Sequence, residues 1–240
     1  MILAYVFSVS YLVNLLLKVQ MKKILASVAF LIAAISSAAH ATPVLQNADF
    51  ADNNVTPGGY NYSSSWGGDV SAPGWTFSGL SGISANSGAW GAVAPAGGSA
   101  YAFLQTGFND PSYNGNFSQT FNSTGTNNLT FSFNLAERIN CCGDIGAQVV
   151  GVFFDGVQLN AFQPDASGAW SLYSVMINNV AAGSHTVSFA GLTTSPDTAA
   201  FVADVQLMST AVPEPSVLAL LGLAMFAFGA ARRTSGNNNA

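Results

Sequence analysis

The central part of the chain alternates hydrophobic and polar residues with the period of two that belongs to half-buried strands. From 129 to 135, Leu and Phe occupy the odd positions while Thr, Ser and Asn occupy the even ones. In 201–207 the same alternation puts Phe201 and Ala203 on the buried face and Asp204 on the other. Further strands are predicted at 44–50, 75–77, 101–104, 117–121, 149–154, 157–159, 173–177 and 187–189.

The connections between these segments are rich in Gly, Ser and Asn. Asp155-Gly156 joins two segments and supplies the positive φ that a tight hairpin turn needs. No helix of convincing length is predicted in this region. About eight or nine short strands separated by such turns predict an all-β fold with two packed sheets.

The N-terminal end has the three parts of a secretory signal peptide at residues 21–41. Met21-Lys22-Lys23 is positively charged, 24–35 is apolar, and Ala39-His40-Ala41 is a small-x-small cleavage site, so the exported protein is expected to begin at Thr42. Residues 1–20 carry an apolar run of their own. We interpret them as a start codon assigned too early, the alternative being an extra membrane segment.

The C-terminal end combines a proline segment, an apolar run and a basic pair. Val212-Pro213-Glu214-Pro215 stays extended because proline locks φ and lacks an N–H. The run 217–231 is predicted to be a transmembrane helix, and Arg232-Arg233 holds its end in the cytoplasm. Its fifteen residues span about 22 Å, less than the roughly 30 Å of a hydrocarbon core. We therefore expect a marginal, transient anchor.

This tail, 209–240, resembles the PEP-CTERM sorting signal of exported proteins in Gram-negative bacteria. The resemblance implies export by the general secretion machinery, transit through the inner membrane with the domain facing the periplasm, and processing by an exosortase. The protein would then reach the cell surface or an extracellular polysaccharide matrix, as in a biofilm. Whether it is released or stays attached is left open.

The formal charge of the remaining domain, 42–208, limits the classes of partner that it can bind. Between 42 and 211 there are ten acidic residues and one basic residue, Arg138, which gives a formal charge of −9. Such a surface cannot neutralise phosphates, so nucleic acid and anionic lipid are excluded as partners. Divalent cations and neutral polar ligands fit better.

Landmarks along the domain resemble the galactose-binding-like jelly roll of many carbohydrate-binding modules. They are Leu45–Phe50, Pro73-Gly74-Trp75, Phe117–Phe121, Asp155-Gly156, Trp170 with Tyr173, Gly183–Thr186 and Phe201–Val205. The resemblance implies a jelly-roll β-sandwich with Trp75 and Trp170 in its core. It also implies a structural Ca²⁺ that joins Asp49 or Asp52 to Asp204, although Asp49 can equally be a turn acceptor.

Loop aromatics are the predicted ligand contacts. Aromatic faces stack on the apolar C–H faces of sugars, and Asn and Asp bind the hydroxyls. The candidates, all in Gly, Ser and Asn surroundings, are Tyr60, Tyr62, Trp66, Trp90, Phe108 and Tyr113.

The segment 137–144 has the most unusual local chemistry. Cys141 and Cys142 are adjacent, which allows a strained vicinal disulfide, an intermolecular disulfide or a buried thiol pair. Arg138 is a candidate ligand donor. The alternative is an Arg–Asp or Arg–Glu ion pair within the loop.

Catalysis is not expected. His185 is the only histidine after residue 41, where an exposed turn histidine is the ordinary explanation, and no hydrolase or phosphate-binding motif is present. We predict an exported, non-catalytic β-sandwich that binds carbohydrate. The alternative is a secreted carbohydrate-active enzyme that uses Glu137 and Asp144.

Overall fold

The computed structural model describes residues 18, 20, 21, 44–88, 90–107, 110–125, 127–139, 148–194, 197–211 and 221–225. The chain divides into two units, of which one is Ala41–Val212 and the other combines the two end segments. Every strand and both hydrophobic clusters lie in Ala41–Val212. In the other unit, Lys18, Gln20, Met21 and Leu221–Met225 are helical. Among the described residues, no helix has the length and apolar character needed to cross a membrane.

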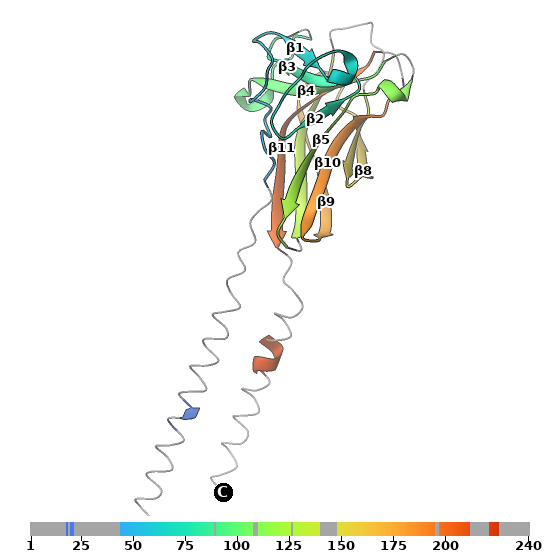
Figure 1. Cartoon of the computed structure of the whole chain (residues 1–240). Coiled ribbons are helices and arrows are strands. Elements are labelled where there is room, and N and C mark those ends of the chain that lie inside the picture. The colour runs from blue at the N-terminus through green and yellow to red at the C-terminus, as the bar shows by residue number, and fades with distance from the viewer. Residues whose placement is uncertain are drawn as a thin grey trace, which may run out of the picture. The chain divides into compact units, whose positions relative to one another are not determined.

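Two antiparallel sheets form the sandwich, which confirms the predicted fold class (Figure 1). The six-stranded sheet has the order β1-β3-β4-β11-β6-β9 and the five-stranded sheet the order β2-β5-β10-β7-β8. The strands are β1 (Tyr60–Tyr62), β2 (Thr76–Ser78), β3 (Ser81–Ala85), β4 (Ala100–Gln105), β5 (Asn116–Ser123), β6 (Asn127–Glu137), β7 (Val150–Phe154), β8 (Val157–Phe162), β9 (Ser171–Val180), β10 (Gly183–Gly191) and β11 (Ala199–Ala211). Three 3₁₀ helices occupy loops: η1 (Ser64–Trp66), η2 (Pro95–Gly97) and η3 (Pro111–Tyr113).

The predicted strand at 44–50 is wrong. Asn47 and Phe50 have φ values of 50° and 57°, so the segment turns back on itself, although Leu45 and Phe50 are buried. The side chain of Gln119 takes the place of a neighbouring strand, because its amide donates to the Gln46 carbonyl at 2.8 Å. The short strands β1 and β3 were not predicted, since β1 has only three residues and Gly and Ser interrupt the hydrophobic pattern of β3.

The main core fills the space between the sheets. Alternate residues of β5, β6 and β10 point into it, including the fully buried Phe117, Phe131, Phe133 and Phe189. Trp75 is 6 % exposed there, packs 5.1 Å from Phe50 between ring centroids and donates its indole N–H to the Asn47 carbonyl. The prediction that Trp75 fills the core therefore agrees with the structure.

A second cluster covers part of the outer face of the six-stranded sheet. Phe201 and Ala203 belong to it, whereas Val202 and Val205 face the main core. A bulge between Ala203 and Gln206, with Asp204 at φ 48°, shifts the alternation by one residue. The prediction that alternate residues of 201–207, starting with Phe201, all share one buried face is therefore wrong. Trp170 also packs against this second cluster, not in the main core.

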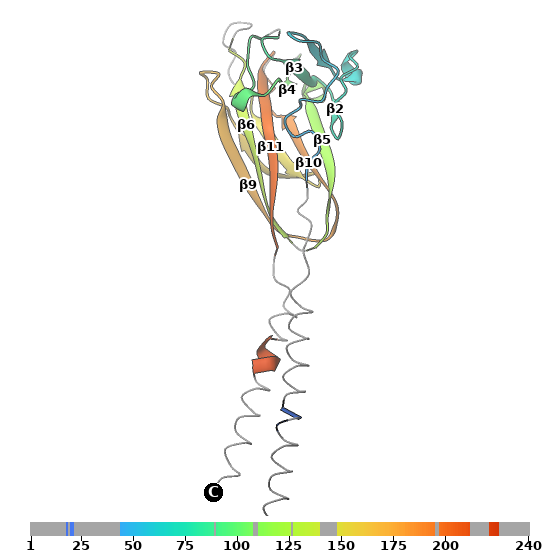
Figure 2. The same cartoon turned by 90° about the vertical axis from the view of Figure 1, so that its left-hand side faces the viewer.

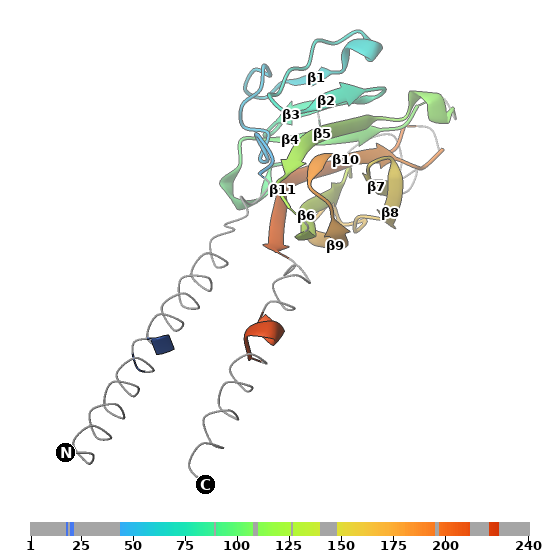
Figure 3. The ribbon, with the colours of Figure 1, turned by 60° about the horizontal axis from the view of Figure 1, so that its bottom comes forward.

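The two ends of the sandwich differ. The long strands β6, β9 and β11 run side by side (Figure 2) and finish together at one end, where Asn127 pairs with both Val180 and Ala211. β11 extends three residues past the predicted domain end at 208. At the opposite end, the chain after β1 forms a loop that carries η1, and the chain after β4 leads to η3. Figure 3 shows β10, β7 and β8 following one another toward the border of the five-stranded sheet that β8 forms.

Candidate functional site

Tyr60, Tyr62 and Trp90 come together on the outer face of the six-stranded sheet. The Tyr60 ring centroid lies 5.3 Å from that of Trp90 and 5.8 Å from that of Tyr62. Trp90 also contacts Phe103 at 4.8 Å, and Tyr62 contacts Phe103 at 5.0 Å. Trp90 and Tyr62 therefore belong to the second cluster, and Tyr60, 48 % exposed, is the member that faces solvent.

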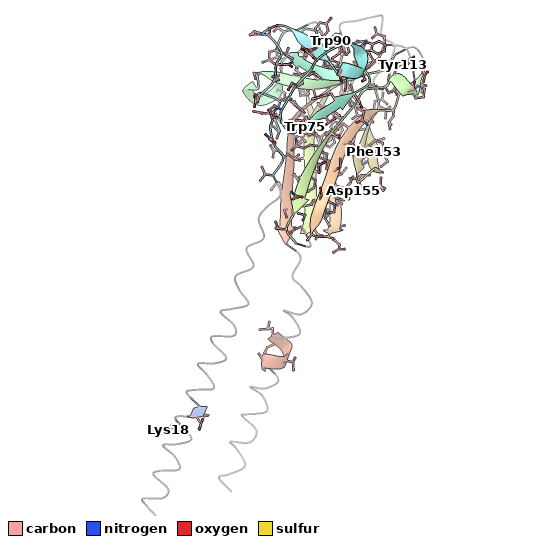
Figure 4. The ribbon with its side chains drawn as sticks, viewed as in Figure 1. Lys18, Trp75, Trp90, Tyr113, Phe153 and Asp155 are labelled. Atoms are coloured by element: carbon pink, nitrogen blue, oxygen red, sulfur yellow. The ribbon has the colours of Figure 1, made fainter. Side chains whose placement is uncertain are left out.

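Trp66 and Tyr113 form a separate aromatic pair at the loop end of the sandwich. Their ring centroids are 5.7 Å apart with an interplanar angle of 72°, an edge-to-face contact. Tyr113 is 42 % exposed, and Figure 4 shows it at the same end of the sandwich as Trp90 and far from Asp155. The pair therefore lies where η1 and η3 meet, with Tyr113 as its exposed member.

Local hydrogen bonds hold the two helices that carry this pair. The Asp110 carboxylate caps η3 by accepting from the Ser112 N–H at 2.9 Å, and this bond lowers the pKa of Asp110. The Ser65 hydroxyl of η1 accepts from the Gly79 N–H at 2.8 Å, which ties η1 to the turn between β2 and β3. The charged Asp110 carboxylate and the serine hydroxyls are polar groups close in sequence to the two rings, as is the Asn114 amide next to Tyr113.

Arg138 is buried and does not fit a role as a ligand donor. Its side chain is 3 % exposed and pairs with the Asp197 carboxylate at 3.0 Å, and it also donates to the Asp197 carbonyl. The ion pair expected as the alternative is present, but Asp197 lies before β11 and not in the 137–144 loop. The physical reason is the sheet order, which sets β6 beside β11.

The ion pair continues into a polar network across the end of the six-stranded sheet. Gln105 donates to Asp197, and the Tyr62 hydroxyl donates to Gln105, so the network joins β1, β4, β11 and β6. Burial raises the pKa of Tyr62 to about 12, helped by Tyr60 and Asp197 and opposed by Arg138. The Tyr62 hydroxyl therefore stays protonated at neutral pH and donates within this network.

Asp49 and Asp204 are brought close to each other, as the cation hypothesis requires. Burial raises the pKa of Asp204, a hydrogen bond from Asn134 at 3.2 Å lowers it, and the charge of Asp49 raises it further. Asp49 also accepts from the Ala51 N–H at 3.2 Å, the turn role weighed as its alternative. Asp52 exchanges backbone hydrogen bonds with the Asn47 side chain. Within the described ranges, no group of three or more His, Cys, Asp or Glu side chains can hold a metal ion.

His185 is not an exposed turn residue. It lies on β10 with its side chain 14 % exposed, stacked on Phe154 at 5.1 Å between ring centroids. Its Nδ1 is 2.8 Å from an Asp155 carboxylate oxygen and its Nε2 is 3.0 Å from the Ala181 carbonyl. Both ring nitrogens face acceptors. Burial lowers the pKa of His185, but these hydrogen bonds and the charge of Asp155 outweigh the effect of burial and raise the pKa.

The outer face of the five-stranded sheet carries an aromatic residue that was not among the candidates. Phe153 faces outward opposite Ser188, which in turn pairs with Ser118. A Cβ on Gly151 would lie 2.7 Å from the Phe153 ring and 3.0 Å from Leu192, so glycine lets both side chains lie across the strand. Because Val152 and Phe154 point inward, Phe153 between them points outward. The sequence did not indicate this position, because the apolar run 149–154 is continuous and does not alternate.

Several predicted site residues lie outside the described residues. They are Ala39, Ala41, Phe108, Cys141, Cys142, Asp144, Val212, Pro213, Glu214, Pro215, Arg232 and Arg233. The predicted helix 217–231 is described only at 221–225.

A family model described as the PEP-CTERM protein-sorting motif matches residues 211–233. The chain therefore carries this sorting motif, which implies export, membrane-associated transit and processing by an exosortase. A comparison with curated proteins gives no match.

Solved structures with a similar fold come from several kinds of protein. The Stig cyclase Fisc of Fischerella sp. TAU, in complex with (3Z)-3-(1-methyl-2-pyrrolidinylidene)-3H-indole, has a TM-score of 0.51 at 11 % identity and covers 73 % of this chain and 100 % of its own. A second cyclase from Fischerella sp. TAU, in complex with 4-(1H-indol-3-yl)butan-2-one, has a TM-score of 0.49 at 11 % identity, with 72 % and 100 % covered. A structure described as "CBM4 structure and function" has a TM-score of 0.41 at 13 % identity, with 69 % and 99 % covered. At these identities, the likeness to Fisc shows the β-sandwich fold and not an activity.

Proposed function

We propose that the protein is an exported, exosortase-processed β-sandwich that binds a neutral carbohydrate at the cell surface or in an extracellular polysaccharide matrix. The observation that carries the proposal is the pair of Trp66 and Tyr113, whose rings are set on two short helices at the loop end. Tyr113 is well exposed, so its ring can stack on the apolar face of a sugar.

Charge supports a neutral ligand. With a single basic residue against ten acidic ones between 42 and 211, and that arginine buried in an ion pair, the domain has no exposed cation to hold a sulfate, phosphate or uronate. Hydroxyl groups of a sugar can instead donate to Asp110 and exchange hydrogen bonds with the serines of η1.

We also propose a structural Ca²⁺ between Asp49 and Asp204. The donors fit a hard cation, since both are carboxylates and Asn134 adds an amide beside them. Burial and, to a smaller extent, the charge of Asp49 raise the pKa of Asp204, and such an ion would offset both effects.

A glycan array followed by calorimetry tests the carbohydrate proposal, with and without calcium. Tyr113→Ala and Trp66→Ala are expected to weaken binding of the selected glycan at least about tenfold, the equivalent of about 1.4 kcal/mol. Tyr60→Ala is the matched control, because Tyr60 is similarly exposed but lies in the other aromatic group. Loss of binding with Phe153→Ala and not with Tyr113→Ala would move the site to the five-stranded sheet and contradict the proposal.

A secreted carbohydrate-active enzyme using Glu137 and Asp144 is the competing function. The same glycans, incubated with the protein, would then release reducing sugar, and Glu137→Gln would abolish that release. Binding without hydrolysis supports the non-catalytic function.

A further inference from the structure

The six-stranded sheet ends in an open edge at β9. In the described part of the chain β9 pairs with β6 alone, so one side of its backbone has no strand partner. Pairing with β6 is regular from Ser171 to Ile177, and the irregularity near Asn179, at φ 57°, comes only after this stretch. Such an edge is a template for another strand.

The other edges of the sandwich are protected and β9 is not. β1 and β2 each have three residues, and β8 pairs with β7 through a bulge. Short strands and bulges are the usual defences against edge pairing, as are proline and charged residues. The segment 171–180 contains no proline and no charged residue.

The outer face of β9 carries two exposed apolar side chains on either side of Ser174, and none of its own residues is charged. Leu172 and Met176 are 71 % and 73 % exposed, while Tyr173, Val175 and Ile177 point toward the main core. Met176 stands opposite Thr130, and Thr130 stands opposite Met208, itself 64 % exposed, so the apolar surface continues inward from the edge.

We infer that β9 is a self-association surface whose partner is β9 of a second copy of this chain, paired antiparallel about a two-fold axis. Leu172 and Met176 lie at equal distances in sequence from Ser174, which is the midpoint of Ser171–Ile177. An axis there sets Leu172 of each copy opposite Met176 of the other, so the two apolar residues cover each other twice.

The symmetric placement of Leu172 and Met176 about Ser174 favours a second copy as the occupant, and the charge of the β9 edge does not oppose it. Two domains of formal charge −9 repel each other wherever acidic residues meet. The β9 strand has no charged residue, so two copies can pair along it without placing like charges together. The paired strands would join two six-stranded sheets into one continuous sheet.

Analytical ultracentrifugation of the unit Ala41–Val212 tests the proposal, since both sheets and both clusters are contained in it. The wild-type unit is expected to dimerise at concentrations up to about 100 µM, and Met176→Lys or Leu172→Lys to raise the dimer Kd at least about tenfold. Val157→Lys is the matched control, because Val157 is 66 % exposed on the edge strand of the other sheet. A thermal melt of each variant checks that the monomer remains folded.

A cross-link gives a second, positive measurement. In a Cys141→Ser, Cys142→Ser background, Ser174→Cys is expected to form a disulfide-linked dimer on mild oxidation, and Val157→Cys to stay monomeric. A wild-type unit that stays monomeric, a dimer that Met176→Lys leaves intact, or an open-ended assembly in place of a dimer overturns the proposal.

Discussion

Asp204 has a left-handed backbone conformation inside the long strand β11. Its φ of 48° produces the bulge in β11, and the bulge carries its carboxylate toward Asp49 and Asn134. Because the folded pKa of Asp204 is raised, the ionised carboxylate costs stability at neutral pH, and that cost disappears as pH falls through the folded pKa. A bound cation would remove the same cost.

Replacing Asp204 by Asn separates repulsion from cation binding. In chelator at neutral pH, Asp204→Asn is expected to raise the melting temperature by roughly 2–4 °C, because the repulsion with Asp49 is gone. Calcium is expected to raise the melting temperature of the wild type, by mass action, and not that of the variant. Asp165→Asn, at an exposed turn, is the control. A wild-type melting curve that calcium leaves unchanged would eliminate the proposed ion.

The hairpin of β7 and β8 shows how one turn is tied to the rest of its sheet. Asp155 and Gly156 have φ values of 48° and 79°, which both central residues of a type I′ turn require. The Asp155 carboxylate accepts from the Thr186 N–H at 2.8 Å and pairs with His185, so the turn is fastened to β10. The strength of this attachment depends on the charge of His185.

Stability is expected to depend on pH through this attachment. Burial lowers the pKa of His185, but the hydrogen bonds with Asp155 and Ala181 and the charge of Asp155 outweigh it and raise the pKa above 6.5. The contribution is therefore complete below about pH 6.5 and is lost as pH rises through the folded pKa. Urea unfolding should show His185→Gln destabilised by roughly 0.5–1 kcal/mol more at pH 5.5 than at pH 8.5. Asn adopts the same positive φ as Asp155, so Asp155→Asn should remove this pH dependence of the unfolding free energy without straining the turn. If Asp155→Asn keeps the pH dependence, the ion pair between His185 and Asp155 does not cause it.

At the scale of the whole molecule, the sorting motif at 211–233 decides the route of the domain. Replacing Pro213-Glu214-Pro215 by alanines is expected to leave the protein full-length and in the membrane fraction, because the segment offered to the exosortase is no longer held extended. Immunoblotting of the membrane and medium fractions, with mass spectrometry of the C-terminal peptide, measures this. Alanines at Thr234 and Ser235, beyond the arginines, are the control. Normal release of the triple-alanine variant would refute the role of the motif in processing.

Features carried by neighbouring residues could be predicted from the sequence. The alternation in 129–135, the Asp155-Gly156 turn and the order of parts in the C-terminal tail each lie within a short segment, where the backbone geometry or the membrane acts directly on those residues. The two-sheet fold could be predicted from these alternating segments, because many such segments can bury their apolar faces only against one another.

Features that depend on distant partners were decided by the tertiary structure alone. Arg138 pairs with a residue 59 positions away because β6 and β11 are neighbours. Phe201 faces the outer cluster because a bulge, which no local pattern signals, shifts the register of β11. The sequence predicted a strand at 173–177 and a loop position for Trp90, but only the sheet order leaves β9 at an open edge and packs Trp90 against a second cluster. The alternation along a strand specifies which residues share a face. The packing of the assembled sheets decides whether that face lies in the main core, against the second cluster or in solvent.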